Sequence, residues 1–196
     1  MIEAKLYFKY GVMGSGKTRD LQKNYYSFTE DGKSVIIMKP QIDTKGEDKV
    51  IARDNQSNKV DLLINKDDNI YIIISKYLID NNLDYILVDE AQFLEKEQID
   101  QLSDIVDYFN IPVICYGIRT DFRNNLFAGG QELFAIADVR EEMTKMCSCG
   151  NMSIYNVRFD KDDNPVFDGQ QVAIDGEDYT YKSMCRRCQK KLKKKK

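Results

Sequence analysis

The sequence has 196 residues, of which 42% are hydrophobic and 31% charged, and its formal net charge is −3 at pH 7. This length suits one full domain with a small appendage, and the charge gives no global attraction to nucleic acid or anionic lipid. Histidine is absent, which excludes Ser–His and Cys–His nucleophile schemes. No run approaches the ~20 apolar residues that span a bilayer, and the N-terminus lacks signal-peptide character. We therefore expect a cytoplasmic protein with reduced cysteines and neither a membrane nor a nucleic-acid partner.

Short apolar runs alternate with helix-like segments, a pattern typical of a mostly parallel sheet covered by helices. Strands are expected at residues 6–8, 35–38, 70–74, 85–89 and 112–117. Helices are expected from residue 17 to about 28, over 95–109, where apolar residues follow one helix face, and over 133–137. Residues 43–69 are polar and poorly periodic, which predicts a long loop with little regular structure.

The pattern changes after about residue 141. Strand-like residues 154–159 and 171–174 flank a turn-rich stretch, and cysteine pairs bracket the whole. We therefore expect an α/β domain over residues 1–141 and a small second unit over residues 142–189. Residues 190–196 are six lysines and one leucine, and such a terminal run is typical of a solvated, disordered tail.

The strongest motif is a phosphate-binding loop directly after the first expected strand. It fits G-x-x-x-x-G-K-[ST] at every position, with Gly11, Val12, Met13, Gly14, Ser15, Gly16, Lys17 and Thr18. The glycines let the backbone turn its N–H groups towards phosphate oxygens, and the helix expected at Lys17 adds the partial positive charge of its N-terminus. Lys17 should reach the β- and γ-phosphates, and the Thr18 hydroxyl should ligate Mg²⁺. The motif predicts binding of ATP or a close relative with magnesium.

Two acidic residues, Asp89 and Glu90, end the strand expected at 85–89. An acid at the carboxyl end of such a strand stands where an α/β sheet places ligand chemistry. We expect Asp89 to hold Mg²⁺ and Glu90 to face the substrate. Without histidine, Glu90 is the candidate general base. The alternative is that Glu90 orients water or forms a salt bridge.

Four of the five cysteines form two close pairs, Cys147 with Cys149 and Cys185 with Cys188. Four thiolates in two pairs suit tetrahedral Zn²⁺, although a single intervening residue constrains the first pair. Disulfides are the alternative, and a reducing compartment disfavours them. A nucleic-acid-binding ribbon would use the same zinc unit, but the loop here is acidic. Cys115 lies in an apolar run and is expected in the core.

Taken in order, these motifs resemble the thymidine kinase family of bacteria, large DNA viruses and animal cytosol, over residues 5–188. Residues 38–43 are similar to the family's K-P-x-x-D segment, residues 89–93 match its D-E-x-Q-F box, and residues 120–127 resemble its D-F-R-G-x-P-F stretch. The second unit resembles the family's zinc-anchored lasso. The resemblance implies a P-loop, RecA-like, mostly parallel sheet, a zinc-stapled lasso domain at the C-terminus, and a homotetramer.

The resemblance also implies transfer of the ATP γ-phosphate to the 5′-hydroxyl of thymidine or deoxyuridine, with Glu90 as base and dTTP as feedback inhibitor. Beyond the loop, it places around ATP the residues Asp89, Glu90, Ala91, Gln92 and Lys45, the last replacing a usual arginine. Around the pyrimidine it places Phe93, Ile118, Phe122, Phe127, Asn156, Val172, Ala173, Ile174, Asp175, Gly176 and Tyr181. For the aromatic residues among them, plain core packing is the alternative.

Two other functions stay open at this point. Residues 89–92 also resemble the DExx box of helicase-like ATPases, but such motors need two lobes of ~150 residues each and this chain has room for one. The second is a non-catalytic regulator that binds zinc and nucleotide, against which the intact Lys17 and Glu90 argue. Assaying a panel of nucleosides with ATP and Mg²⁺ separates these functions.

Overall fold

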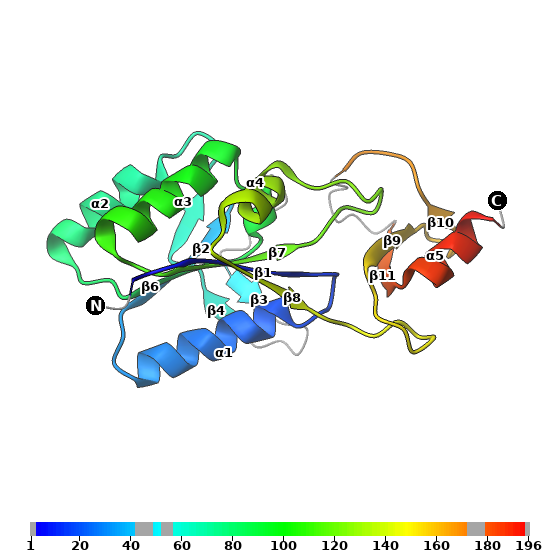
Figure 1. Ribbon diagram of the computed structural model, residues 1–196, viewed down its shortest axis with the longest axis horizontal. Helices are drawn as coiled ribbons and strands as arrows, with labels where there is room; N and C mark the ends of the chain where they lie inside the picture. The colour runs from blue at the N-terminus through cyan, green and yellow to red at the C-terminus, as the bar shows by residue number, and fades with distance from the viewer. Residues whose placement is uncertain (1–2, 42–48, 52–56, 172–178, 195–196) are drawn as a thin grey trace.

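The computed structural model describes residues 3–41, 49–51, 57–171 and 179–194. Its largest element is a six-stranded sheet in the order β5-β2-β6-β7-β1-β8, in which every neighbouring pair is parallel (Figure 1). The strands are β1 (Leu6–Gly11), β2 (Val35–Pro40), β5 (Leu62–Ile64), β6 (Tyr85–Val88), β7 (Val113–Ile118) and β8 (Val139–Met143). The expected α/β class with a mostly parallel sheet is confirmed.

Helices cover both faces of this sheet. Helix α1 (Lys17–Glu30) lies on one face, and α2 (Ile70–Asp80), α3 (Lys96–Phe109) and α4 (Ala128–Ile136) lie on the other (Figure 1). Successive strand residues point to opposite faces. Ile86 and Val88 accordingly pack in the cluster under α2, α3 and α4, whereas Leu87 packs with Leu21 of α1. Burial on both faces explains why these strands are continuous apolar runs rather than alternating ones.

The expected strand at residues 70–74 is wrong, because these residues form the first part of α2. The side chain of Asn69 caps the helix by accepting from the Ile72 N–H at 2.9 Å. Ile70 and Ile74, one turn apart, are fully buried against the sheet. The topology also requires a helix here, since β5 and β6 belong to one parallel sheet and need a crossover between them.

The expected loop at residues 43–69 contains more regular structure than its polar sequence indicated. Strand β3 (Lys49–Ile51) pairs antiparallel with β4 (Ser57–Lys59), and β5 adds the outer strand of the main sheet beside β2. The other expected elements of the domain are confirmed in type. The helix expected at 133–137 is longer, because α4 begins at Ala128.

After β8 the chain forms a three-stranded antiparallel sheet, in the order β10-β9-β11, and a terminal helix. These elements are β9 (Tyr155–Phe159), β10 (Pro165–Val166), β11 (Thr180–Met184) and α5 (Arg186–Lys193). The expected strand at 154–159 is confirmed as β9, whereas most of the one expected at 171–174 lies outside the described residues. The basic run was expected to be disordered from residue 190, but Lys190 to Lys193 continue α5. No helix of the described residues is long and apolar enough to cross a membrane.

Candidate active site

The loop over residues 11–18 joins the carboxyl end of β1 to α1, and three of its positions favour glycine, either because a side chain would clash or because the backbone is left-handed. A Cβ atom at Gly11 would lie 2.4 Å from the carbonyl oxygen of Met143. Gly14 and Gly16 have φ values of 72° and 92°, in the left-handed region that favours glycine. The loop therefore takes a conformation that depends on glycine at these positions.

The charged part of the loop is compact. The Lys17 ammonium donates to the Val12 carbonyl at 3.0 Å and lies 3.4 Å from the Ser15 hydroxyl, so it folds over the loop that it follows. Helix α1 begins at Lys17, and Thr18 stands in its first turn. The N–H groups of a first helical turn and a neighbouring ammonium together form an anion site suited to phosphate.

Asp89 directly follows β6, and β7 lies between β6 and β1, so the carboxylate stands at the same sheet edge as the loop. Its side chain is nearly inaccessible, with Asp89 6% exposed. Burial, and secondarily the charge of Glu90, raises the pKa of Asp89 to about 6, although Lys39 and Lys17 oppose the shift. A desolvated carboxylate beside a phosphate loop fits a Mg²⁺ ligand, because a bound cation would favour its charged form.

Glu90 has a backbone φ of 50°, which is uncommon for a residue with a side chain. It precedes the short 3-10 helix η1 (Ala91–Phe93), and its N–H donates to the Asp89 carboxylate at 3.0 Å. Strained backbone of this kind concentrates at functional sites. The strained turn and the hydrogen bond from its N–H to Asp89 mark Glu90 as a candidate functional residue beside the buried carboxylate.

Gln92 and Ala91 lie under this turn. The Gln92 side-chain oxygen accepts from the Ile118 N–H at 3.1 Å, tying η1 to the carboxyl end of β7. Ala91 is fully buried and Gln92 is 3% exposed. Within the described structure, both residues therefore support the positions of Glu90 and Ile118.

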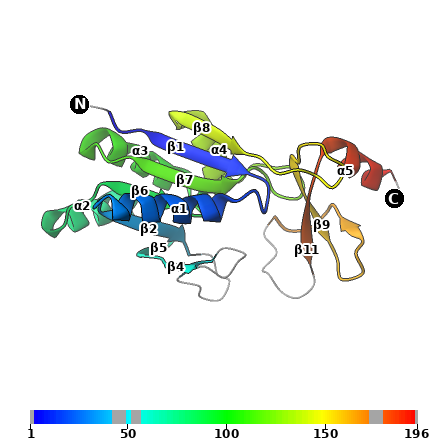
Figure 2. The ribbon, with the colours of Figure 1, turned by 90° about the horizontal axis from the view of Figure 1, so that it is seen from below.

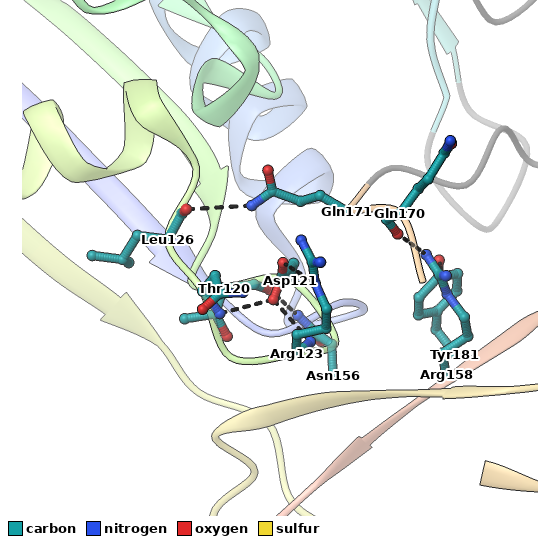
Figure 3. A network of polar contacts seen from close by, with 10 residues as sticks. Thr120, Asp121, Arg123, Leu126, Asn156, Arg158, Gln170, Gln171 and Tyr181 are labelled. Carbon is teal, nitrogen blue, oxygen red and sulfur yellow. Dashed lines mark hydrogen bonds and ion pairs between the residues drawn. The ribbon is translucent and has the colours of Figure 1, made fainter. Parts of the chain in front are cut away.

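The aromatic residues expected around the base fall into two groups. Phe93 and Phe127 pack edge to face, with ring centroids 5.1 Å apart. Phe122 and Tyr181 are linked through Arg158. Its guanidinium carbon lies 3.6 Å from the Phe122 ring centroid. Its Nε donates to the Tyr181 hydroxyl at 2.9 Å, and Figure 3 shows these two side chains next to each other. The structure thus brings a residue of the loop after β7 against residues of β9 and β11.

Asn156, expected near the base, bridges two backbone segments. Its Oδ1 accepts from the Met13 N–H at 2.8 Å, and its Nδ2 donates to the Thr120 carbonyl at 2.9 Å. The following turn is held by Asp121, whose carboxylate accepts from the N–H groups of Arg123 and Asn125 (Figure 3). Asn156 therefore joins the phosphate loop to the segment that carries Phe122.

The four paired cysteines form one cluster, in which all Sγ atoms lie within 4.8 Å of one another. The side chain of Asn151 lowers the pKa of the Cys149 thiol to about 6, and the neighbouring thiols raise the pKa of Cys188 to about 12. Tetrahedral zinc with Zn–S bonds of about 2.3 Å would separate its sulfur ligands by about 3.8 Å. The four sulfur atoms and their spacing therefore fit zinc. The single residue between Cys147 and Cys149 does not prevent both thiols from reaching the cluster.

Six of the expected site residues lie outside the described residues, namely Lys45, Val172, Ala173, Ile174, Asp175 and Gly176. Three residues at the site were not singled out from the sequence: Lys145, Arg158 and Ser183. The sequence did hold a signal for Arg158, which is a charged residue within the strand Tyr155–Phe159. It lies two residues after Asn156, so both side chains are on the same face of that strand. Lys145 and Ser183 each precede a clustered cysteine by two residues, but nothing in the sequence indicates what they contact.

The fold and this edge of the sheet define a class of protein. A parallel sheet, a glycine-dependent loop leading into a helix, and an acidic residue ending a second strand at the same edge are the features of a P-loop nucleotide-binding protein. A family model described as thymidine kinase matches residues 4–189.

Curated relatives agree with this match. Proteins named thymidine kinase from Mannheimia succiniciproducens and Coxiella burnetii are 41% and 39% identical, over 93% and 94% of both chains. The one from Shewanella oneidensis is 40% identical over 94% of this chain and 95% of its own. A crystal structure of Bacteroides Pif1 bound to ssDNA covers 72% of this chain and 38% of its own, but a TM-score of 0.38 at 17% identity supports no argument. The chain belongs to the thymidine kinase family.

Proposed function

We propose that this protein transfers the γ-phosphate of MgATP to the 5′-hydroxyl of thymidine or deoxyuridine. The observation that carries the proposal is the placement of the phosphate loop, Asp89 and Glu90 at one edge of the parallel sheet. Family membership over nearly the whole chain favours this ATP-dependent phosphotransferase over a helicase-like ATPase or a zinc-binding regulator.

The proposed mechanism gives each group at the sheet edge one task. Loop N–H groups and the Lys17 ammonium hold the β- and γ-phosphates, and Thr18 with Asp89 would hold Mg²⁺, which supplies charge neutralisation during transfer. Glu90 accepts the proton of the 5′-hydroxyl as that oxygen attacks the γ-phosphorus, and the bond from this phosphorus to the β–γ bridging oxygen breaks to release ADP. Positioning and charge carry most of the catalysis, because phosphoryl transfer passes through a loose transition state.

We call the part of the chain after β8, with β9, β10, β11 and α5, the C-terminal unit. The nucleoside is proposed to bind between the phosphate loop and this unit, near Ile118, Phe122, Phe127 and Tyr181. Planar side chains there support stacking on a pyrimidine. The division into a P-loop domain and a zinc-binding lasso is likewise proposed. Its boundary lies after Met143, two residues later than expected from the sequence, because β8 continues to that residue. A cytoplasmic location, a homotetramer and feedback by dTTP complete the proposal, and sedimentation and dTTP inhibition assays test the last two.

The deciding experiment is a panel of nucleosides incubated with ATP and Mg²⁺, read out as monophosphate formed. Thymidine and deoxyuridine should be phosphorylated, and deoxyadenosine and deoxyguanosine should be essentially inactive. Lys17→Ala is the control for phosphorylation that depends on the loop. Release of phosphate without any nucleoside monophosphate, or stimulation by single-stranded DNA, would instead support an ATPase.

A further inference from the structure

Met13, in the phosphate loop, makes hydrogen bonds with three side chains of the C-terminal unit. The Met13 N–H donates to Asn156 Oδ1 at 2.8 Å, and the Met13 carbonyl accepts from the Ser183 hydroxyl at 2.6 Å and from the Lys145 ammonium at 3.3 Å. Both polar groups of this one loop residue are thus bound by side chains more than a hundred residues away in the chain. We call Lys145, Asn156 and Ser183 the Met13 cluster.

The Met13 cluster is a built arrangement rather than a chance set of surface contacts. Asn156 and Ser183 are directly opposite each other in the antiparallel pair of β9 and β11. Asn156 is 2% exposed, and its amide is used at both ends, by Met13 and by Thr120. Lys145 also lies 3.4 Å from the Ser183 hydroxyl, which links the members to one another. Figure 2 shows β9 and β11 beyond the carboxyl ends of β1 and β7.

These contacts fix how the loop can bind phosphate. The Met13 N–H is occupied by Asn156, so Met13 anchors the loop to β9, while the Ser15 N–H donates to the Val12 carbonyl within the loop at 3.2 Å. Hydrogen bonds to both the N–H and the carbonyl of Met13 also restrain rotation of the loop backbone. Nucleotide binding would otherwise have to restrict that rotation itself, at a cost in affinity.

The same cluster connects the loop to the two other parts of the site. Lys145 and Ser183 precede Cys147 and Cys185 by two residues each, so both stand on segments that converge on the cysteine cluster. Asn156 shares a face of β9 with Arg158, which stacks on Phe122. One strand therefore touches the phosphate loop and the proposed nucleoside pocket with successive side chains of one face.

We propose that Lys145, Asn156 and Ser183 are positioning residues for the phosphate loop, and that they make nucleotide affinity depend on the C-terminal unit. The role of β9 in linking nucleotide to nucleoside rests on the proposed function, whereas the effect on nucleotide binding does not. Coupling of this kind is reciprocal, so an occupied nucleoside pocket and an occupied phosphate loop would strengthen each other.

The test measures the dissociation constant of a non-hydrolysable ATP analogue with Mg²⁺ by calorimetry, on the zinc-loaded full chain. Ser183→Ala and Asn156→Ala should each weaken the analogue about 3- to 10-fold, the loss expected for one or two hydrogen bonds. Ser183→Thr keeps the hydroxyl and should bind as the wild type does. Lys182→Ala is the matched control, because Lys182 is the preceding residue and pairs with exposed Asp163 instead of the loop.

Thermal melting of each variant accompanies the titrations, so that loss of folded protein is not counted as loss of affinity. Unchanged analogue affinity in folded Ser183→Ala and Asn156→Ala would overturn the proposal, whatever nucleosides the enzyme accepts. Weaker analogue binding in both, with Ser183→Thr restored, would support it even if the nucleoside panel showed no thymidine phosphorylation. The two proposals thus fail on different measurements.

Discussion

The guanidinium carbon of Arg158 lies 3.6 Å from the centroid of the Phe122 ring, closer than any other cation to a ring in the described structure. Arg158 is 2% exposed, and no ion pair among the described residues involves it. Among the described residues, its guanidinium faces aromatic rings and donates to the Tyr181 hydroxyl and the Gln170 carbonyl. A buried arginine held this way fixes the relative positions of the two aromatic residues expected to contact the base.

We therefore predict that Arg158→Ala raises the KM for thymidine about 10-fold, the combined effect of a lost cation–π contact and a lost hydrogen bond. Arg158→Lys should lose nearly as much, because an ammonium lacks the planar surface and the Nε donor. Steady-state kinetics with each substrate varied measures the effect. Arg123→Lys is the matched control, since Arg123 lies 5.8 Å from the same ring and is partly exposed. A wild-type thymidine KM in Arg158→Lys would contradict the stacking role.

Glu90→Gln should lower kcat about 100-fold while the affinity for nucleotide changes little. The substitution keeps the shape of the side chain but removes the proton acceptor, and general-base loss costs about 10²–10⁴-fold. The lower end is expected because phosphoryl transfer depends mainly on positioning. Single-turnover kinetics gives the rate, with exposed Glu97→Gln as control. A kcat within a few-fold of the wild type would mean that Glu90 is not the base.

Asp89→Asn should stabilise the ligand-free protein at neutral pH. The pKa of Asp89 is raised from 3.8 to about 6 in the folded protein, chiefly by burial. The folded state therefore holds a proton that the unfolded state has released, so stability falls as pH rises through this window and the penalty persists above it. Removing the charge should raise the unfolding free energy on the order of 2 kcal/mol at pH 7.5 and change it little near pH 4.

Denaturant unfolding at the two pH values, without Mg²⁺ or nucleotide, checks this effect. Exposed Asp107→Asn is the control. The same Asp89→Asn variant should lose most of its phosphoryl transfer, which separates the stability effect from the catalytic one. Equal stability of Asp89→Asn and wild type at pH 7.5 would show that burial of the charged carboxylate does not destabilise the fold.

Purified protein should contain about one zinc per chain, and serine at any of the four clustered cysteines should reduce this content. Elemental analysis measures the content, and Cys115→Ala is the control because Cys115 is buried in the main sheet. Metal removal should weaken binding of the ATP analogue as well as of thymidine, because Lys145 and Ser183 connect the cysteine segments to Met13. Loss of thymidine binding alone would mean that the cluster serves only the nucleoside pocket.

The sequence could predict the groups at the sheet edge because each follows a local rule. The phosphate loop is one contiguous motif, and Asp89 follows directly on an apolar strand. The residue type and spacing of the cysteine pairs indicate a metal site. The strand prediction for residues 70–74 was wrong because a short run of β-branched residues fits a buried strand as well as it fits a buried helix. The Asn69 cap and the crossover between parallel strands favour the helix, and the crossover is a property of the whole fold.

The Met13 cluster could not be predicted, because its members are brought together only by tertiary structure. From the sequence, a loop in the first domain would be expected to function independently of the zinc unit. Asn156 was associated with the base through resemblance alone, while its contacts depend on the register of β9 against β11. Arg158 was visible as a charge in an apolar strand, but the ring that accepts it lies in a distant loop.

Helix α5 gives the molecule a strongly unequal distribution of charge. The last eleven residues carry eight lysines and arginines and no acid, so the remaining 185 residues carry a net charge of −11 within a total of −3. Figure 1 places α5 at the opposite end of the long axis from the N-terminus. The protein therefore combines a strongly basic terminal helix with a strongly acidic remainder, a contrast that its isoelectric point of about 5.2 does not show. At neutral pH and low salt it should adsorb to both cation and anion exchangers, and its orientation on a charged surface should invert with the sign of that surface.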